Sequence, residues 1–215
     1  MRTVDGHVVF SPTDLVGFLA CTHLTELDRA SFGHLVERPK KVDEELQLLI
    51  DKGLEHEARY LERLQAEGSQ VTVIAQNDRS ESGLLVARDR TLEAMYRGDE
   101  VIYQATFVEG GWSGQADFLR RVDRSEVPSQ LGPWTYEPED TKLALSAKAG
   151  ALLQLLTYAR MIESVQGVAP NQVHVVLGRA DAPKVSFRVA DYAAYHRLAT
   201  RRFEDLVTLG PPPTP

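Results

Sequence analysis

The stretch WTYEPEDTKLALSAKAGALLQLLTYARM, residues 134–161, reads as a strand that leads directly into a helix. In a β-strand, residues two apart point to the same face, so Asp140 and Lys142 emerge together. In a helix, residues four apart are stacked neighbours, so Gln154 and Tyr158 share a face. Taken alone, such pairs are also typical of a surface ion pair and of helix residues that face water.

The surrounding segments predict an α/β protein. Ser11 is a suitable N-cap before Pro12, where a first helix begins, and a longer helix ends at Gly68. The apolar stripe of this longer helix consists of Leu46, Leu49, Ile50, Leu54, Leu61 and Leu64. Strand-like runs lie at 71–75, 101–108, 112–122, 134–145, 172–178 and 184–190, and further helical patterns at 83–98, 147–166 and 191–210.

Two connections define the expected sheet. The Gly110-Gly111 pair joins two strands as a hairpin. Strand 134–145, helix 147–166 and strand 172–178 form a right-handed parallel crossover, which places the helix against the sheet. Gln154 and Tyr158 then lie near the residues that emerge from strand 134–145.

Length and composition indicate an ordinary globular protein. The chain has 215 residues, of which 43% are apolar and 26% charged, enough for one well-packed domain. We place this domain at residues 1–210, with a helical part at about 11–67, an α/β core at about 71–208 and a proline-rich tail or linker at 211–215. No apolar run approaches the ~20 residues that span a bilayer, and the N-terminus has no signal-peptide pattern. We therefore expect a cytoplasmic protein without a membrane partner.

The formal charge of -7 argues against a protein that coats nucleic acid indiscriminately, because such proteins carry a broad basic surface. A nuclease remains compatible with this charge, since carboxylates that hold metal ions count toward it.

Asp117 is a carboxylate inside an apolar strand, between Ala116 and Phe118. Such a group is unfavourable unless it is paired, hydrated or bound to a cation. Antiparallel neighbours on one face lie about 5 Å apart, so Asp117 and Asp140 share a site if their strands pair in register. The alternative is an aspartate at a bulge or a strand end.

The long helix has polar exceptions in its segment GLEHE, residues 53–57. At 100° per residue, Glu57 falls near the centre of the leucine stripe and His56 at its edge. Gly53 leaves room for the close approach of another element. His56 is equally consistent with a satisfied surface or core histidine.

Other chemical motifs are missing. The remaining histidines have no ligand spacing, and the chain has no glycine-rich phosphate loop, no G-x-S-x-G elbow and no C-x-x-C pair. Cys21 is the only cysteine, which excludes an internal disulfide, and its apolar run GFLAC predicts burial.

In order, the segments GLEHE, GQAD, DTK and QLLTY resemble the motifs of the RecB-like branch of the PD-(D/E)XK nuclease superfamily. The resemblance covers most of the chain and is nearest to RecB-type nuclease domains that are fused to helicases. It implies a restriction-endonuclease-like core, with a mixed central sheet flanked by helices. It also implies a divalent-metal-dependent nuclease that hydrolyses phosphodiester bonds in DNA, in DNA repair or recombination.

The resemblance also implies residue roles. His56, Asp117, Asp140 and the Thr141 carbonyl would ligate the metal. Lys142 would orient or activate the attacking water and offset charge in the transition state. Gln154 and Tyr158 would hold the site together or contact the nucleic-acid backbone, whereas Glu57 would support the site or pair with a buried cation.

These residue types suit the chemistry. Mg²⁺ prefers oxygen ligands and keeps several waters, so a few carboxylates suffice to hold it, and a histidine ligand is also compatible with Mn²⁺. Metal and ammonium together stabilise negative charge that develops on a phosphoryl group.

The sequence departs from the family pattern at two positions. Asp117 follows Ala116 instead of a proline. Pro138 interrupts the third strand and predicts a bulge or an unpaired edge before Asp140.

Two other functions are compatible with the sequence. A catalytically silent member of the fold would bind DNA or a helicase partner. A small-molecule hydrolase or an unrelated α/β binding protein would require the motif order to be chance. Some RecB-like nucleases hold an iron-sulfur cluster with four cysteines, the first of which Cys21 resembles; one cysteine cannot supply four ligands, so we expect no cluster from this chain alone.

Overall fold

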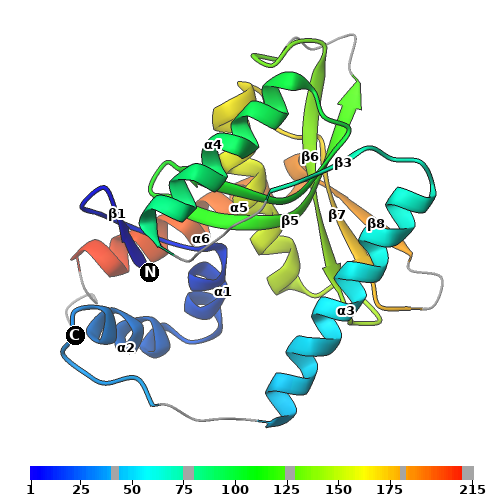
Figure 1. The fold of residues 1–215 in the computed structure, drawn as a ribbon. Helices are drawn as coiled ribbons and strands as arrows, with labels where there is room; N and C mark the ends of the chain where they lie inside the picture. Colours follow the sequence, from blue (N-terminus) through cyan, green and yellow to red (C-terminus); the bar gives the residue numbers. More distant parts are fainter. Residues whose placement is uncertain (40–43, 75–79, 124–128, 180–182, 210–215) are drawn as a thin grey trace.

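The computed structural model describes residues 1–39, 44–74, 80–123, 129–179 and 183–209 (Figure 1). The predicted tail at 211–215 lies outside these residues. The elements are β1 (Arg2–Val4), β2 (His7–Val9), α1 (Pro12–Ala20), α2 (Thr22–Phe32), α3 (Glu44–Ala66), β3 (Val71–Val73), α4 (Glu81–Arg97), β4 (Val101–Glu109), β5 (Trp112–Asp123), β6 (Trp134–Lys142), α5 (Ala149–Gln166), β7 (Gln172–Leu177), β8 (Lys184–Arg188) and α6 (Val189–Leu209).

The central sheet has six strands in the order β3-β4-β5-β6-β7-β8. The pairs β3/β4 and β6/β7 are parallel, and the pairs β4/β5, β5/β6 and β7/β8 are antiparallel. The mixed sheet and the parallel pairing of β6 with β7 through α5 confirm the α/β prediction.

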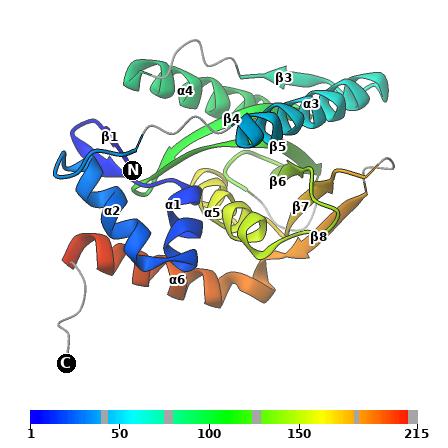
Figure 2. The same ribbon diagram turned by 90° about the horizontal axis from the view of Figure 1, so that it is seen from below.

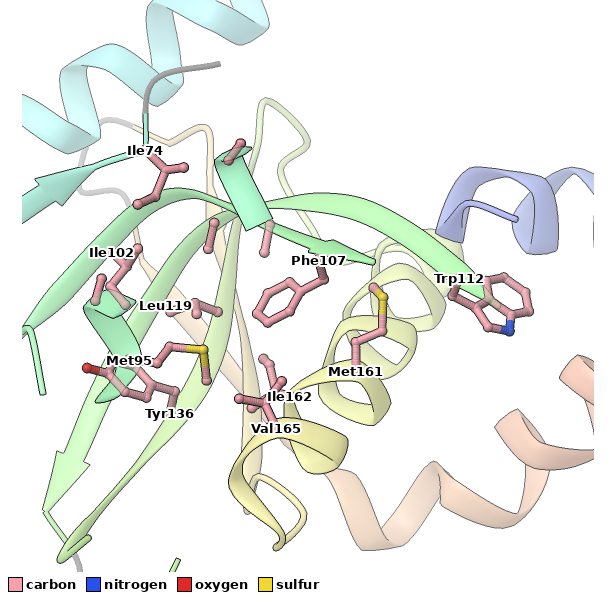
Figure 3. Packing of buried hydrophobic residues seen from close by; sticks show 14 of the residues in the cluster. Ile74, Met95, Ile102, Phe107, Trp112, Leu119, Tyr136, Met161, Ile162 and Val165 are labelled. Atoms are coloured by element: carbon pink, nitrogen blue, oxygen red, sulfur yellow. The ribbon is translucent and has the colours of Figure 1, made fainter. Parts of the chain in front are cut away.

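Helix α3 crosses one face of the sheet. Its Tyr60 packs edge-to-face on Phe118 of β5 at 5.1 Å between ring centroids, and its Leu64 belongs to the same buried cluster. The opposite face carries the main core, in which Met95 of α4 and Ile162 of α5 surround Leu119 (Figure 3). The alternation of strand side chains assigns each strand position to one of these two faces.

Local sequence signals explain the helix boundaries. Ser11 and Asp14 form a capping box, in which the Ser11 hydroxyl accepts from the Asp14 N–H and the Asp14 carboxylate accepts from the Ser11 N–H. Helix α5 ends at Gly167, whose φ of 73° favours glycine.

The N-terminal region confirms one prediction and contradicts another. The first helix, α1, begins at Pro12 with Ser11 as its N-cap, as predicted. Cys21 is exposed rather than buried, and its extended backbone separates α1 from α2. The hairpin of β1 and β2 precedes α1.

The leucine stripe of α3 is buried in its second half only. Leu49 is 63% exposed and Leu54 59% exposed, whereas Leu64 is 3% exposed. The first half of α3 extends past the end of the sheet, so these leucines have no sheet surface to cover (Figure 1).

Pro138 lies neither at a bulge nor on an edge. It pairs in regular register with Leu119, and β6 lies between β5 and β7 in the sheet. The described β6/β7 ladder begins one residue later, at Glu139.

Among the described residues, no helix is both long and apolar enough to cross a membrane.

Candidate active site

Asp117 and Asp140 lie on neighbouring strands at the same level of the sheet. The last paired residues of β5 and β6 in this direction are Phe118 and Glu139, so the two aspartates follow in the same antiparallel register. Tyr60 of α3 donates a hydrogen bond to Glu139, which assigns Glu139 to the α3 face. Asp140 therefore points to the opposite face, which α5 covers.

The Asp117 carboxylate holds the end of β6. Its Oδ2 accepts hydrogen bonds from the Thr141 N–H at 2.9 Å and from the Thr141 hydroxyl at 3.2 Å. The Asp117 carboxylate thus accepts the Thr141 N–H in place of a backbone carbonyl of the neighbouring strand. These hydrogen bonds fix Asp117 beside Asp140.

Lys142 is the cation of the site. Its Nζ lies 2.8 Å from Oδ1 and 2.7 Å from Oδ2 of Asp140, and only Oδ1 accepts a hydrogen bond with good geometry. The Asp140 side chain is 9% exposed and the Lys142 side chain 37% exposed. The ammonium group thus pairs with a buried carboxylate, while part of the Lys142 side chain stays exposed to solvent.

The electrostatics of this group favour a bound cation. Burial raises the pKa of Asp140 well above its usual range, and repulsion from Asp117 raises it further, while Lys142 opposes both effects. Burial acts to lower the pKa of Lys142, but the Asp140 and Asp117 carboxylates outweigh it and the pKa is raised. Negative charge is thus in excess at this end of β5 and β6.

Glu57 of α3 is a further carboxylate, whose charge interacts with Asp117 and Lys142. Burial raises its pKa, and the charge of Asp117 raises it further. Glu57 accepts hydrogen bonds from the Gln104 amide and the Tyr103 hydroxyl, which lower the pKa, and Lys142 lowers it too. The structure therefore gives Glu57 a definite place, where the sequence left its role open.

Gln104 reaches Glu57 because its backbone leaves the regular strand. Its φ is 60°, a left-handed conformation that a non-glycine residue adopts only with strain. In the β4/β5 ladder, Tyr103 pairs with Phe118 and Ala105 with Ala116, but Gln104 between them has no partner. The residue opposite this gap is Asp117.

Tyr158 approaches the site from α5. Its hydroxyl donates to the Gln115 carbonyl at 2.7 Å, and its pKa is raised by burial and by the charges of Asp117 and Asp140. Gly114 makes room for the ring, because a Cβ there would lie 2.9 Å from Tyr158 Cε1.

Gln154 is separated from the other predicted site residues. Its amide nitrogen lies 3.4 Å from the Thr13 hydroxyl of α1 in an exposed contact. The position four residues before Tyr158 therefore leads toward α1 rather than to the carboxylates.

His56 is buried, with 7% of its surface exposed, and its Nε2 has no hydrogen-bond partner in the described part of the chain. Across the described ranges, no three His, Cys, Asp or Glu side chains are grouped so that they could hold a metal ion. His56 thus does not join the two aspartates in a ready three-ligand cluster.

The sequence carried little signal for two neighbours of the site. Tyr103 and Gln104 lie in an ordinary strand pattern, and only the left-handed backbone at Gln104 marks it as special. That conformation cannot be read from residue types, since glutamine rarely adopts it.

No protein-family model matches the chain. No curated protein matches it either.

The geometry suits a hard divalent cation. Two carboxylates lie side by side, and among the described residues the buried Asp140 Oδ2 has the Lys142 ammonium nearby but accepts no hydrogen bond, so it has lone pairs left for a cation. A cation that keeps several waters needs few protein ligands. The set of donors therefore fits Mg²⁺ or Mn²⁺ without requiring His56.

Proposed function

We propose that this protein is a divalent-metal-dependent nuclease that hydrolyses phosphodiester bonds in DNA, with a role in DNA repair or recombination. The observation that carries the proposal is the placement of Asp117 beside Asp140, with Lys142 paired to Asp140 on the same strand end. Paired acids and an adjacent ammonium on neighbouring strands form a group suited to phosphoryl transfer.

Asp117 and Asp140 would hold Mg²⁺ or Mn²⁺. When bound, the ion would polarise the phosphoryl oxygen and lower the pKa of a bound water. The charge of Glu57 on α3 interacts with Asp117 and Lys142, so we propose that it adds negative charge beside the metal, although within the described ranges it forms no three-ligand cluster with the two aspartates. The predicted ligand roles of His56 and the Thr141 carbonyl stay predictions.

Lys142 would act on the negative charge that develops during cleavage. Its raised pKa keeps it protonated at neutral pH, so it would donate hydrogen bonds to the phosphate or the attacking water rather than accept a proton. Tyr158 would hold the strand end through the Gln115 carbonyl and thereby position Asp117.

A catalytically silent module is the second candidate, and two observations favour it. Lys142 is engaged by Asp140, and Gln154 contacts Thr13 instead of the site. Such a module would bind DNA or a helicase partner without cutting.

A cleavage assay separates the two candidates. Linear and circular DNA, each single- and double-stranded, is incubated with wild-type protein and Mg²⁺, Mn²⁺ or EDTA. We expect metal-dependent cleavage that Asp140→Ala abolishes. Asp123→Ala is the matched control, because Asp123 lies on β5 but its side chain is 77% exposed and ion-paired to Arg121.

Equal cleavage by wild type and Asp140→Ala would show that the activity arises elsewhere. Binding of Mn²⁺ or DNA without cleavage of any substrate would support the silent module.

A further inference from the structure

A cleft lies between α5 and α6. Figure 2 shows these two helices on the opposite side of the sheet from α3. Its volume is about 430 Å³, which is within the range of small-molecule sites. The lining residues are Leu156, Ala159, Arg160, Glu163, Val189, Ala193, His196, Arg197, Thr200, Arg201 and Glu204. None of them belongs to the candidate active site.

Two guanidinium groups of the cleft lack a counterion among the described residues. Arg197 and Arg201 form no ion pair with any described residue. They lie four residues apart on α6 and so share a face, where like charges repel. An anion between them would remove this repulsion.

The other charges of the cleft leave an excess of positive charge. Arg160 lies 3.7 Å from Glu204, whose carboxylate also accepts a hydrogen bond from the Trp112 indole at 3.1 Å. Glu163 is the only other carboxylate of the lining. Three guanidinium groups thus face two carboxylates, one of which is already engaged.

One residue of the cleft lining, Thr200, has a buried hydroxyl. Thr200 is 3% exposed, and its Oγ1 has no hydrogen-bond partner among the described residues. Thr91 and Thr157, also buried in helices, donate to the carbonyl four residues earlier, at 2.9 and 3.0 Å. A buried hydroxyl without a partner is unfavourable, so Thr200 marks the place of a missing acceptor.

We propose that the α5/α6 cleft binds a phosphate monoester. Arg197 and Arg201 would take the phosphate oxygens, because planar guanidinium groups donate two hydrogen bonds to such a group. The Thr200 hydroxyl would donate to the same ligand, and the apolar wall of Leu156, Ala159 and Val189 would receive its uncharged body. A free mononucleotide and the 5′-phosphate end of a DNA strand both present this chemistry.

Calorimetric titration tests the proposal on the whole chain in EDTA, so that a metal-dependent site cannot contribute. The probes are deoxyadenosine monophosphate, deoxyadenosine, and one oligodeoxynucleotide with and without a 5′-phosphate. We expect the phosphorylated member of each pair to bind at least about tenfold more tightly, since charge-assisted hydrogen bonds are the strong ones. Whichever phosphorylated probe binds more tightly identifies the source of the ligand.

Matched variants assign the binding to the cleft. The double variant Arg197→Gln/Arg201→Gln should bind the phosphorylated probes about tenfold or more weakly, because each substitution removes a charged hydrogen bond to the phosphate. Arg202→Gln is the control, because Arg202 is exposed on the same helix but does not line the cleft. This variant should bind the phosphorylated probes as tightly as the wild type does. Equal affinity for deoxyadenosine and its monophosphate, or full affinity in the double variant, would overturn the proposal.

Thr200→Val distinguishes a ligand contact from a simple packing defect. Replacement of an unpartnered buried hydroxyl by a methyl group should raise the melting temperature of the free protein. If Thr200 contacts the ligand, the same variant should also bind the monophosphate several-fold more weakly. A raised melting temperature with unchanged affinity would exclude Thr200 from the site.

Discussion

Asp117 of β5 holds Thr141 of β6 through two hydrogen bonds, one from the backbone N–H at 2.9 Å and one from the side-chain hydroxyl at 3.2 Å. Within the described part of the chain, the neighbouring Asp140 accepts a hydrogen bond only from the Lys142 ammonium, through Oδ1, and holds no backbone group. The two aspartates of the candidate site therefore differ in what they contribute to the fold.

Asp117→Ala and Asp140→Ala should consequently differ in stability. Loss of Asp117 leaves the Thr141 N–H without its charged acceptor, so we expect the free energy of unfolding to fall by about 1 to 3 kcal/mol. Loss of Asp140 removes a buried carboxylate that burial and Asp117 disfavour, so metal-free Asp140→Ala should be as stable as the wild type or more so. Urea unfolding in EDTA measures both, and an equal loss in the two variants would contradict the assignment.

Lys142→Met should separate binding from catalysis. The variant removes a cation that acts on charge in the transition state, so the cleavage rate should fall by about two orders of magnitude or more. Mn²⁺ and DNA binding should persist, because both aspartates remain. Single-turnover cleavage and calorimetric titration measure these effects, with the exposed Lys148→Met as control. Loss of metal binding in Lys142→Met would show that the lysine mainly organises the ligands.

Glu57→Gln and His56→Gln compare two adjacent residues of α3. The charge of Glu57 interacts with Asp117 and Lys142, so its loss should weaken Mn²⁺ binding by about tenfold. The effect of His56→Gln should be smaller, since the charge of Glu57 acts on Lys142, whereas His56 is not among the groups that mainly shift the pKa of Asp140 or Lys142. Titration of Mn²⁺ into each variant compares the two affinities. A larger loss of Mn²⁺ affinity in His56→Gln than in Glu57→Gln would support His56 as a metal ligand.

His196 should make stability depend on pH. Burial, together with the positive charges of Arg160 and Arg197, lowers its pKa to about 4. Between about pH 6.5 and 4 the unfolded chain therefore binds the proton more readily than the folded chain does. The contribution of this group to the free energy of unfolding is complete above pH 6.5 and is lost as the pH falls to 4. The total loss is about 3 kcal/mol at most.

Urea unfolding at pH 4.5 and pH 7.5 tests this dependence. We expect the stability difference between the two pH values to be smaller in His196→Gln than in the wild type, because the other titrating groups are common to both proteins. The same dependence in both would show that His196 contributes nothing to it.

Two leucines of α3 test whether the helix is buried in its second half only. Leu64→Ala should lower the free energy of unfolding by about 2 to 4 kcal/mol, because it opens a cavity beside Tyr60 and Phe118. Leu49→Ala should change it by less than about 0.5 kcal/mol, since Leu49 is 63% exposed. Comparable losses at both positions, measured by thermal or urea unfolding, would mean that the first half of α3 is covered in solution.

Local patterns in the sequence were sufficient for much of the fold. Apolar periodicity, the Ser11 cap and the terminating glycines depend on residues within a few positions of each other, and they predicted most elements and the parallel crossover through α5. Strand parity alone placed Asp140 and Lys142 on one face, because successive side chains alternate whatever the partner strand. The ion pair between them follows from that spacing.

The tertiary structure decided what depends on distant partners. The sequence places an apolar stripe along all of α3, yet burial requires a surface opposite, and Leu54 is 59% exposed whereas Leu64 is 3% exposed. Gln154 and Tyr158 share a helix face, but only Tyr158 lies over the strand ends, while Gln154 meets Thr13 of α1. Glu57 and Gln104 meet across 47 positions through a strained backbone. No local pattern encodes such contacts, because they arise from how whole elements pack.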